Sequence, residues 1–319
     1  MTPPAPLPTS VRRVVIGSTL HAPIAEQLRA ARGDLELRGA PYQQVSADDL
    51  SWADAYVGFK RPPTGTMGSV RWVHCTGAGV DAWFQPTELD RSILLTRSSE
   101  SFGPMIAEWA LARALAVAQQ LRDLDRCQQE SRWAPREPAL LRGTTAVVVG
   151  TGDVGSHCAR LFRALGCRTI GVSRTGRADP AHFDEQLTVA QLGDAVARAD
   201  WLLMMLPLTA TTRQLLSRDL LARARGAVLI NAGRGAVVDE SAIPEALDAG
   251  WLRAAALDVF EREPLPVTSP LWTDPRVIVS PHISGLTTVE GTVAGFLECL
   301  GSIEQGEAPR WTVDREHQY

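Results

Sequence analysis

A glycine-rich hexapeptide constrains the fold of this chain more than any other feature of the sequence. The segment Gly150-Thr151-Gly152-Asp153-Val154-Gly155 fits the pattern G-x-G-x-x-G. It directly follows an apolar run and opens a stretch with helical character. In that context Gly150 permits a tight turn, Gly152 lets the backbone approach a pyrophosphate, and Gly155 lets the helix pack closely on the strand. The helix N-terminus adds N–H groups and partial positive charge for the phosphates. The pattern therefore predicts a bound dinucleotide, with Gly150, Gly152, Asp153, Val154 and Gly155 at the cofactor.

Short apolar, β-branched runs alternate with helical stretches along the whole chain, which is typical of βαβ units around a parallel sheet. The runs predicted as strands are Arg13–Ile16, Leu35–Arg38, Ala55–Gly58, Trp72–Cys75, Ile93–Thr96, Thr145–Val149, Thr169–Val172, Trp201–Leu206, Ala227–Asn231, Ala254–Asp258 and Val277–Ser280. Because most of these runs lack polar alternation, both faces of each sheet should be covered by helices. We predict an α/β fold with two doubly wound, Rossmann-like parallel sheets.

One of the two predicted domains is discontinuous in sequence. Residues 101–285 hold the glycine-rich turn and form the dinucleotide-binding domain. The helical stretch Leu286–Gly306 has no strand after it, so we expect it to pack back onto the N-terminal unit. Residues 1–100 and 286–319 then form the other domain. The polar, proline-containing segment Leu121–Pro138 is predicted to be a connector that wraps over a surface.

Composition excludes several classes of protein. The formal charge of −4 argues against a broadly basic nucleic-acid-binding surface. No apolar run reaches the ~18 residues that a membrane span needs. The five cysteines are scattered without a Cys-x-x-Cys pair, so we expect no structural metal site and free thiols in a reducing cytoplasm.

The second strand of the dinucleotide-binding domain indicates which dinucleotide is bound. NAD sites usually carry an Asp or Glu about 20 residues after the glycines, to hold the ribose 2′-hydroxyl. Here the segment is Gly171-Val172-Ser173-Arg174-Thr175-Gly176-Arg177, which has no carboxylate. Arg174 and Arg177 suit a 2′-phosphate through charge-assisted bonds, and Ser173 and Thr175 can donate to its oxygens. We predict a preference for NADP(H), with NAD(H) as the alternative; ordinary solvated arginines are the competing interpretation.

Three polar segments follow predicted strands of the same sheet. They contain Arg234 (residues 231–235), Glu263 with Asp258 and Glu261 (residues 258–266), and His282 (residues 280–285). The carboxyl ends of parallel strands meet at one edge, where ligands bind. A cation can clamp a substrate carboxylate and polarise a carbonyl. A histidine can supply the proton that joins oxygen as hydride reaches carbon, and an acid can orient that histidine. The trio is what reduction of a 2-keto acid requires.

These segments resemble the D-isomer-specific 2-hydroxyacid dehydrogenase family from about Val14 to Gly301. Its landmarks occur in order along the chain: Thr76-Gly77-Ala78-Gly79-Val80-Asp81, Ala107-Glu108-Trp109, Leu141-Arg142-Gly143, the Gly150–Gly155 turn, Leu206-Pro207-Leu208-Thr209 with Thr212, Asn231-Ala232-Gly233-Arg234-Gly235, Ala256-Leu257-Asp258-Val259-Phe260 with Glu263-Pro264-Leu265, and Ser280-Pro281-His282. The missing ribose acid resembles the NADP-using glyoxylate/hydroxypyruvate reductase branch. Trp109 stands where His or Tyr is frequent, which leaves the substrate open.

The resemblance implies roles for individual residues. Arg234 would bind the substrate carboxylate and keto oxygen, His282 would be the acid/base, and Glu263 its partner. The backbone at Ala78 and Gly79 would hold the carboxylate as a small anion nest. The domain of residues 1–100 and 286–319 would bind the substrate, and the cofactor domain would form a homodimer.

The resemblance also extends the cofactor site beyond the glycine-rich turn. Asp258 would contact the nicotinamide carboxamide. The remaining residues expected at the cofactor are Leu206, Pro207, Thr212, Ala232, Gly233, Arg234 and His282.

Other functions of the same fold stay open at this point. Relatives oxidise formate or phosphite, but formate types pair the histidine with glutamine, and phosphite types need a lysine that residues 74–80 lack. A nucleotide-sensing scaffold without physiological turnover, as in corepressor relatives, is the alternative from a different class. Lys60 and Arg61 follow a predicted strand, and their role is open.

Overall fold

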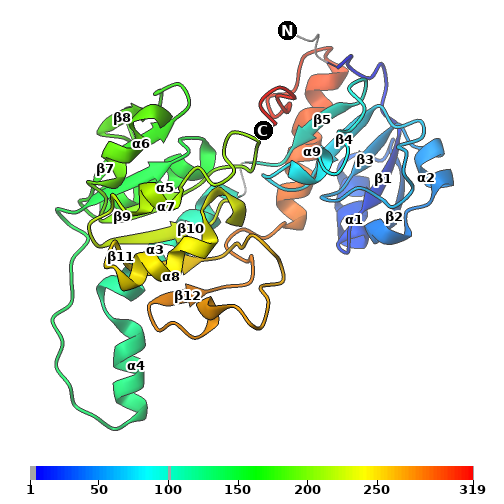
Figure 1. Cartoon of the computed structure of the whole chain (residues 1–319). Coiled ribbons are helices and arrows are strands. Elements are labelled where there is room, and N and C mark those ends of the chain that lie inside the picture. Colours follow the sequence, from blue (N-terminus) through cyan, green and yellow to red (C-terminus); the bar gives the residue numbers. More distant parts are fainter. Residues whose placement is uncertain (1–4, 100–101, 319) are drawn as a thin grey trace. The chain divides into compact units, whose positions relative to one another are not determined.

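The computed structural model describes residues 5–99 and 102–318, and the chain forms two compact units (Figure 1). Unit 1 comprises Met1–Ser101 with Thr287–Tyr319, and unit 2 comprises Phe102–Leu286. Each unit has its own parallel sheet with helices packed on it, which confirms the predicted α/β, Rossmann-like class. The assignment of substrate binding to unit 1 stays a prediction.

Unit 1 is built on a parallel sheet in the order β2-β1-β3-β4-β5. Its strands are β1 (Arg13–Gly17), β2 (Glu36–Ala40), β3 (Ala55–Val57), β4 (Trp72–Cys75) and β5 (Leu94–Arg97). Helices α1 (His21–Ala31) and α9 (Val289–Glu304) cover one face, and α2 (Ala47–Trp52) packs on the other. The indole of Trp72 stacks on Phe296 of α9 with ring centroids 4.7 Å apart, so the last helix belongs to this core.

Unit 2 has a longer parallel sheet in the order β12-β11-β10-β9-β6-β7-β8. Its strands are β6 (Thr145–Val149), β7 (Arg168–Ser173), β8 (Glu185–Thr188), β9 (Trp201–Met204), β10 (Ala227–Asn231), β11 (Leu252–Leu257) and β12 (Val277–Val279). The strand order reverses at β6, because β7 and β8 follow it on one side and β9 to β12 on the other. The glycine-rich turn after β6 therefore lies at the switch point where such sheets bind ligands.

Helices of unit 2 cover both faces of this sheet. The helices are α3 (Phe102–Ala118), α5 (Asp153–Ala164), α6 (Leu192–Val196), α7 (Arg218–Leu221) and α8 (Ile243–Asp248). Side chains of α6, α7 and α8 pack in one buried cluster with alternate residues of the central strands, among them Val147 and Val149. The opposite face meets α5, where Gly155 approaches Val148. Strands buried on both sides explain the apolar runs that the sequence shows.

The segment Leu121–Pro138 differs from its prediction. Residues Leu121–Gln129 form a helix, α4, rather than a connector, and Figure 1 shows α4 and the segment after it standing away from the rest of unit 2. The helix forms because the first proline comes only at Pro135, and an ion pair between Asp123 and Arg126, three residues apart, supports it. Trp133 beyond it is 96% exposed.

Two further features bear on the composition-based expectations. All five cysteines are buried free thiols. In the part of the chain that the structure describes, helices long and apolar enough to traverse a lipid bilayer are absent.

Candidate active site

The imidazole of His282 and the carboxylate of Glu263 form a close pair in unit 2. His282 follows β12 and Glu263 lies in the loop after β11, and His282 Nδ1 is 2.8 Å from Glu263 Oε2. Both side chains keep access to solvent, at 41% and 37% exposure. The other carboxylate oxygen, Oε1, accepts a hydrogen bond from the Phe260 N–H at 3.1 Å, which fixes the orientation of the acid. A carboxylate on Nδ1 leaves Nε2 as the nitrogen available to a reactant.

The pKa of Glu263 is lowered from its ordinary value. Burial alone would raise this pKa, but hydrogen bonds from His282 and from the Phe260 N–H outweigh it, and the charges of His282 and Arg234 add to them. Glu263 is therefore ionised around neutral pH, as a partner of a protonated imidazole must be.

Backbone strain at His282 shows how the local sequence positions the ring. His282 has a φ of 54°, in the left-handed region that side chains other than glycine seldom adopt. Its N–H donates to the Asp258 carbonyl at 2.8 Å. The Asp258 carboxylate, which is fully buried, accepts from Ser280 Oγ at 2.5 Å, from Ile283 N at 3.0 Å and from Ser284 N at 2.7 Å. These bonds hold the loop on both sides of His282, so Asp258 acts as an anchor. Its contact with a nicotinamide carboxamide stays a prediction.

Arg234 extends from the loop after β10 toward the same part of unit 2. Its charge lowers the pKa of Glu263, and its Nη1 donates to the Gly233 carbonyl at 2.9 Å. The neighbouring Gly235 explains how the loops come together: a Cβ there would lie 1.9 Å from the Phe260 carbonyl carbon. Only glycine lets the arginine loop pack on the loop that carries Glu263. The structure thus brings Arg234, Glu263 and His282 into one region, as the sequence predicts.

A pocket of about 350 Å³ borders the imidazole–carboxylate pair within unit 2. Apart from Glu263 and His282, the residues that line it are apolar: Phe260, Pro264, Leu265, Trp272, Val279 and Pro281. Trp272 is 49% exposed and is not among the residues that the sequence predicts at the site. Its place next to Glu263 depends on the packing of two loops, for which the sequence carries no signal.

Glu240 is a second residue near the pair that sequence reasoning missed. Its Oε2 accepts a hydrogen bond from the Glu261 N–H at 2.8 Å. Burial raises the pKa of Glu240, and the nearby charges of Glu261 and Glu263 raise it further. It therefore supports the loop that bears Glu263 from behind.

The glycine-rich turn has the geometry that a pyrophosphate needs. Gly150 has a φ of 102°, and a Cβ at Gly155 would lie 1.8 Å from the Gly150 carbonyl oxygen. Gly152, in contrast, faces open space, with no atom within 4 Å of where a Cβ would be. Gly152 is also the N-cap of α5 and supplies no side-chain cap, so the first N–H groups of the helix stay available to an anion. These features fit a dinucleotide.

Two other members of the predicted turn have distinct surroundings. Val154 is partly buried. The Asp153 carboxylate lies 3.5 Å from His157 Nδ1 one helical turn on, and near Gly103 of α3. A contact of either residue with the cofactor stays a prediction.

The segment Ser173–Arg177 curls back beside the glycine-rich turn. The carbonyl oxygen of Arg177 accepts hydrogen bonds from Ser173 Oγ at 3.0 Å and from Thr151 Oγ1 at 3.1 Å. The Arg177 N–H points to Thr175 Oγ1 at 3.4 Å. The side chains of Arg174 and Arg177 are exposed. Two guanidinium groups therefore stand at the end of β7, where the adenosine ribose of a dinucleotide on this turn is expected.

The segment after β9 closes the other side of the turn. Leu206 lies close to both Gly150 and Gly233. A Cβ at Gly150 would be 3.1 Å from Leu206 Cδ2, and a Cβ at Gly233 would be 2.6 Å from the Leu206 carbonyl oxygen. Thr212 Oγ1 donates to the Pro207 carbonyl at 2.7 Å and holds residues 207–212 in a compact turn. Ala232 lies beside them and is 8% exposed. The predicted cofactor residues of unit 2 thus line one edge of its sheet.

The predicted anion loop belongs to unit 1. Ala78 and Gly79 follow β4 and are partly exposed, and neither backbone N–H donates to an acceptor among residues 5–99 and 102–318. Arg97 Nη1 donates to the Ala78 carbonyl at 2.7 Å, which turns that carbonyl toward the arginine. The loop therefore has N–H groups for a carboxylate; the contact itself stays a prediction.

Lys60 and Arg61 differ in their surroundings. Arg61 is partly buried, and its Nη2 donates to the carbonyl of Trp83, whose ring it also covers. Lys60 is exposed, with Nζ 5.6 Å from the centroid of the Tyr42 ring. Arg61 is thus used in the packing of unit 1.

Comparisons with known proteins find similar sequences over most of the chain. The family model for the D-isomer specific 2-hydroxyacid dehydrogenase NAD-binding domain matches residues 111–284. Glyoxylate/hydroxypyruvate reductase A of Klebsiella pneumoniae (strain 342) is 30% identical over 292 residues, which cover 89% of this chain and 93% of that protein. An uncharacterized protein of Streptomyces coelicolor is 36% identical over 244 residues, or 76% of this chain and 87% of that one.

Solved structures give the same result. A D-isomer specific 2-hydroxyacid dehydrogenase of Xanthobacter autotrophicus Py2, in complex with NADPH and MES, has a TM-score of 0.88 at 31% identity, covering 97% of this chain and all of that one. An NADPH-dependent glyoxylate/hydroxypyruvate reductase of Sinorhizobium meliloti, in complex with NADP and sulfate, has a TM-score of 0.83 at 28% identity, with coverage of 97% and 100%.

Proposed function

Because the chain belongs to the D-isomer specific 2-hydroxyacid dehydrogenase family, we propose that it uses NADPH to reduce a small 2-keto acid, glyoxylate or hydroxypyruvate, to the D-2-hydroxy acid. The observation that carries the proposal is the 2.8 Å contact between His282 Nδ1 and Glu263, in the unit that also holds Arg234 and the glycine-rich turn. The Klebsiella relative, named for these two substrates, supports the substrate class.

Three side chains of this chain perform the chemistry in the proposal. Arg234 pairs with the substrate carboxylate and polarises the keto carbonyl, so the negative charge that develops on oxygen is stabilised where it forms. His282, protonated and held by Glu263, gives the proton on Nε2 to that oxygen. The N–H groups of Ala78 and Gly79 bind the carboxylate as well. Positioned proton transfer of this kind typically accelerates a reaction ~10²–10⁴-fold.

NADPH, when bound, supplies the hydride. The N–H groups at the start of α5, beside Gly152, would hold its pyrophosphate. Arg174 and Arg177 would pair with its 2′-phosphate and Thr175 would donate to it, as would Ser173 once its hydroxyl turns away from the Arg177 carbonyl. The absence of a carboxylate from residues 171–177 supports this preference, because an acid there would repel the phosphate. The relatives of known structure that hold NADPH or NADP support it too.

A steady-state panel of 2-keto acids, each with NADPH and with NADH, tests the proposal. We expect turnover of glyoxylate and hydroxypyruvate, with the higher kcat/KM for NADPH. If NADPH binds but no keto acid is turned over, the proposed activity is wrong and a nucleotide-sensing function takes its place. A higher kcat/KM with NADH would contradict the cofactor assignment alone.

We propose in addition that the protein is a homodimer formed through unit 2. Apolar side chains on and after α4 are exposed there, with Trp133 at 96%, Leu140 at 69% and Leu121 at 45%. A second copy of the chain would cover them, since surfaces of this kind are typical of protein interfaces. Light scattering on the purified protein distinguishes a mass near 69 kDa, twice 34.5 kDa, from that of a monomer.

A further inference from the structure

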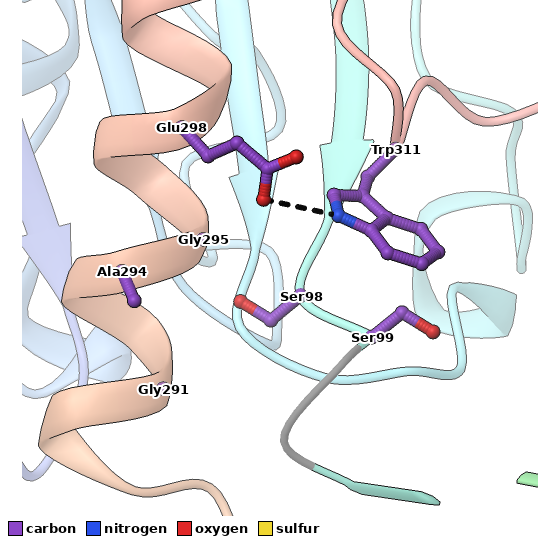
Figure 2. Close-up of a pocket in the computed structure, with 7 residues that line it drawn as sticks. All are labelled: Ser98, Ser99, Gly291, Ala294, Gly295, Glu298 and Trp311. Atoms are coloured by element: carbon purple, nitrogen blue, oxygen red, sulfur yellow. Dashed lines mark hydrogen bonds between the residues drawn. The ribbon is translucent and has the colours of Figure 1, made fainter. Parts of the chain in front are cut away.

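A pocket lies within unit 1, between the end of β5 and helix α9 (Figure 2). Its volume is about 260 Å³, below the ~300–1,000 Å³ of pockets for drug-sized ligands. Five small residues, from α9 and from the segment that follows β5, form its walls together with two larger side chains; the lining residues are Ser98, Ser99, Gly291, Ala294, Gly295, Glu298 and Trp311. None of them belongs to the candidate active site. The pocket is therefore a separate candidate for a small ligand.

A chain of hydrogen bonds through the core of unit 1 ends at this pocket. Trp72 Nε1 donates to Thr96 Oγ1 at 2.8 Å, and Thr96 Oγ1 lies 2.9 Å from His74 Nδ1. The other ring nitrogen, His74 Nε2, lies 3.0 Å from Ser98 Oγ. His74 is fully buried, and burial lowers the pKa of its imidazole to about 3, so the ring is neutral and has one N–H.

His74 thereby connects the core of unit 1 to the pocket. The bond between His74 Nε2 and Ser98 Oγ holds the serine hydroxyl in place at the pocket wall.

Ser99 adds a second hydroxyl to the same space. It is 4% exposed and lines the pocket. The two serines thus present hydroxyl groups that can each donate to a ligand that carries oxygen acceptors.

The opposite wall carries a negative charge. Glu298 Oε2 accepts a hydrogen bond from Trp311 Nε1 at 3.3 Å, and Figure 2 shows both side chains above Ser98 and Ser99. Glu298 is the one charged side chain among the seven lining residues. Arg310 already covers a face of the Trp311 ring, with Cζ 4.5 Å from its centroid. A cationic ligand would therefore use the carboxylate rather than that face of the indole.

We propose that this pocket binds a small primary ammonium compound that also carries an oxygen acceptor, as amino alcohols and amino acids do. The ammonium group pairs with Glu298, and the oxygen accepts hydrogen bonds from Ser98 and Ser99. Gly295 makes room for it: a Cβ at this position would lie 3.0 Å from Ser98 Oγ and 3.4 Å from His74 Nε2. The proposal does not rest on the reductase activity.

Isothermal titration of the full-length protein with ethanolamine, glycine and acetate tests the proposal. The three probes are similar in size, and only the first two have an ammonium group. We expect ethanolamine, glycine or both to bind with one site per chain; ethanolamine alone indicates an amino alcohol, and glycine indicates an amino acid. No binding of either amine at millimolar concentration would overturn the proposal, as would binding of acetate alone.

Two variants locate the site, and a third is the matched control. Glu298→Gln removes the charge of an exposed residue, and Gly295→Ala fills the pocket, so each should weaken amine binding at least tenfold. Gly301→Ala places the same methyl group on the same helix with no atom within 4 Å, and should bind as the wild type does. Circular dichroism checks that each variant is folded. If Gly295→Ala does not fold, the result for Glu298→Gln alone decides whether the site is located correctly. Binding that all three variants retain equally would place the amine elsewhere and overturn the proposal.

Discussion

Two histidines, one in each unit, have surroundings that differ in almost every physical respect. His74 is fully buried in unit 1 between two hydroxyl groups, Thr96 and Ser98. His282 lies on a strained loop of unit 2, partly exposed, with Nδ1 on a carboxylate. The first ring is kept neutral by burial, which lowers the pKa of His74 to about 3. The second ring has a carboxylate partner and access to solvent.

The difference shows what a histidine needs for proton transfer. An imidazole without a counter-charge in a low-dielectric core cannot take up a proton at a useful pH, whatever hydrogen bonds it makes. A carboxylate beside a partly exposed imidazole orients the ring and leaves its other nitrogen open to a reactant. His74 therefore makes hydrogen bonds inside the core, and His282 is the residue that we propose for acid–base chemistry.

The largest expected effect on activity comes from removing the charge of Arg234, beside the pair of His282 and Glu263. Arg234→Gln removes the guanidinium that polarises the keto oxygen in the proposed reaction. We expect kcat/KM for glyoxylate to fall about 10²–10³-fold, as for loss of one oxyanion donor. Arg225→Gln, at an exposed position after α7, is the matched control and should retain activity. Comparable rates for the two variants would remove Arg234 from the mechanism.

The buried histidine should affect stability rather than turnover. Below its ordinary pKa of ~6.5, His74 binds a proton in the unfolded chain but not in the folded one, so stability falls as the pH falls from about 6.5 toward 3. The slope for one such proton is about 1.4 kcal/mol per pH unit. In His74→Gln this part of the slope should vanish. Urea unfolding of both proteins at pH 6.5, 5.5 and 4.5 measures it, and parallel curves would contradict the neutral, buried state of His74.

Glu263 should affect the free energy of unfolding at a lower pH than His74 does. Its pKa is lowered in the folded protein, so its contribution to stability is fully present above ~4.3, the ordinary value of a glutamate, and is lost only as the pH falls through the lower folded value. In Glu263→Gln the loss of stability between pH 4.5 and 3, measured by urea unfolding, should therefore be smaller than in the wild type, because the carboxylate that takes up a proton in that range is gone. An equal or larger loss in the variant would show that the Glu263 pKa is not lowered.

Changing a residue that is expected to select NADPH should have a smaller effect, on binding of the cofactor alone. Arg174→Asp replaces a cation by an anion where the 2′-phosphate is expected. We expect KM for NADPH to rise about 10–100-fold, the worth of a charge-assisted hydrogen bond of roughly 1.5–3 kcal/mol, while KM for NADH falls. Arg160→Asp makes the same charge change at an exposed position of α5 and serves as the control. An unaltered preference for NADPH in Arg174→Asp would defeat the assignment.

The smallest expected effect on stability is at Gly152. Alanine fits there without strain, because φ is −74° and no atom lies within 4 Å of the new Cβ, so the free energy of unfolding should change by less than about 0.5 kcal/mol. The methyl group would nevertheless occupy the space of the pyrophosphate and raise KM for NADPH. Gly155→Ala, whose Cβ would collide with the Gly150 carbonyl, should destabilise the fold strongly. Equal stability of the two variants would contradict the geometry of the turn.

Much of unit 2 could be predicted from the sequence because its signals are local. A buried strand, three glycines at fixed spacing and a helix start occur within about twenty residues, and each demands the same structure. Arg234, Glu263 and His282 could be placed at one sheet edge because parallel strands end there. Their side-chain distances could not be predicted, since the loops that carry them pack through tertiary contacts, such as that of Gly235 with Phe260.

The elements that were missed have weak or misleading patterns. Strand β8 was not predicted because only Leu187 of its four residues is buried, as expected of an edge strand. The sequence of α4 favours a connector over a helix, because it is polar and prolines begin only a few residues later. The pocket at Ser98 has no signal in the sequence because its residues come from the segment after β5, from α9 and from the C-terminal segment, which are distant along the chain.

The central claim is that His282, held by Glu263, donates the proton in the proposed reduction. The most direct test is kcat of His282→Asn with glyoxylate and NADPH, since asparagine tolerates the left-handed backbone at this position and lacks the acid. We predict a fall of at least about a hundredfold with an unchanged circular dichroism spectrum. A rate within about threefold of the wild type, in a folded variant, would contradict the account.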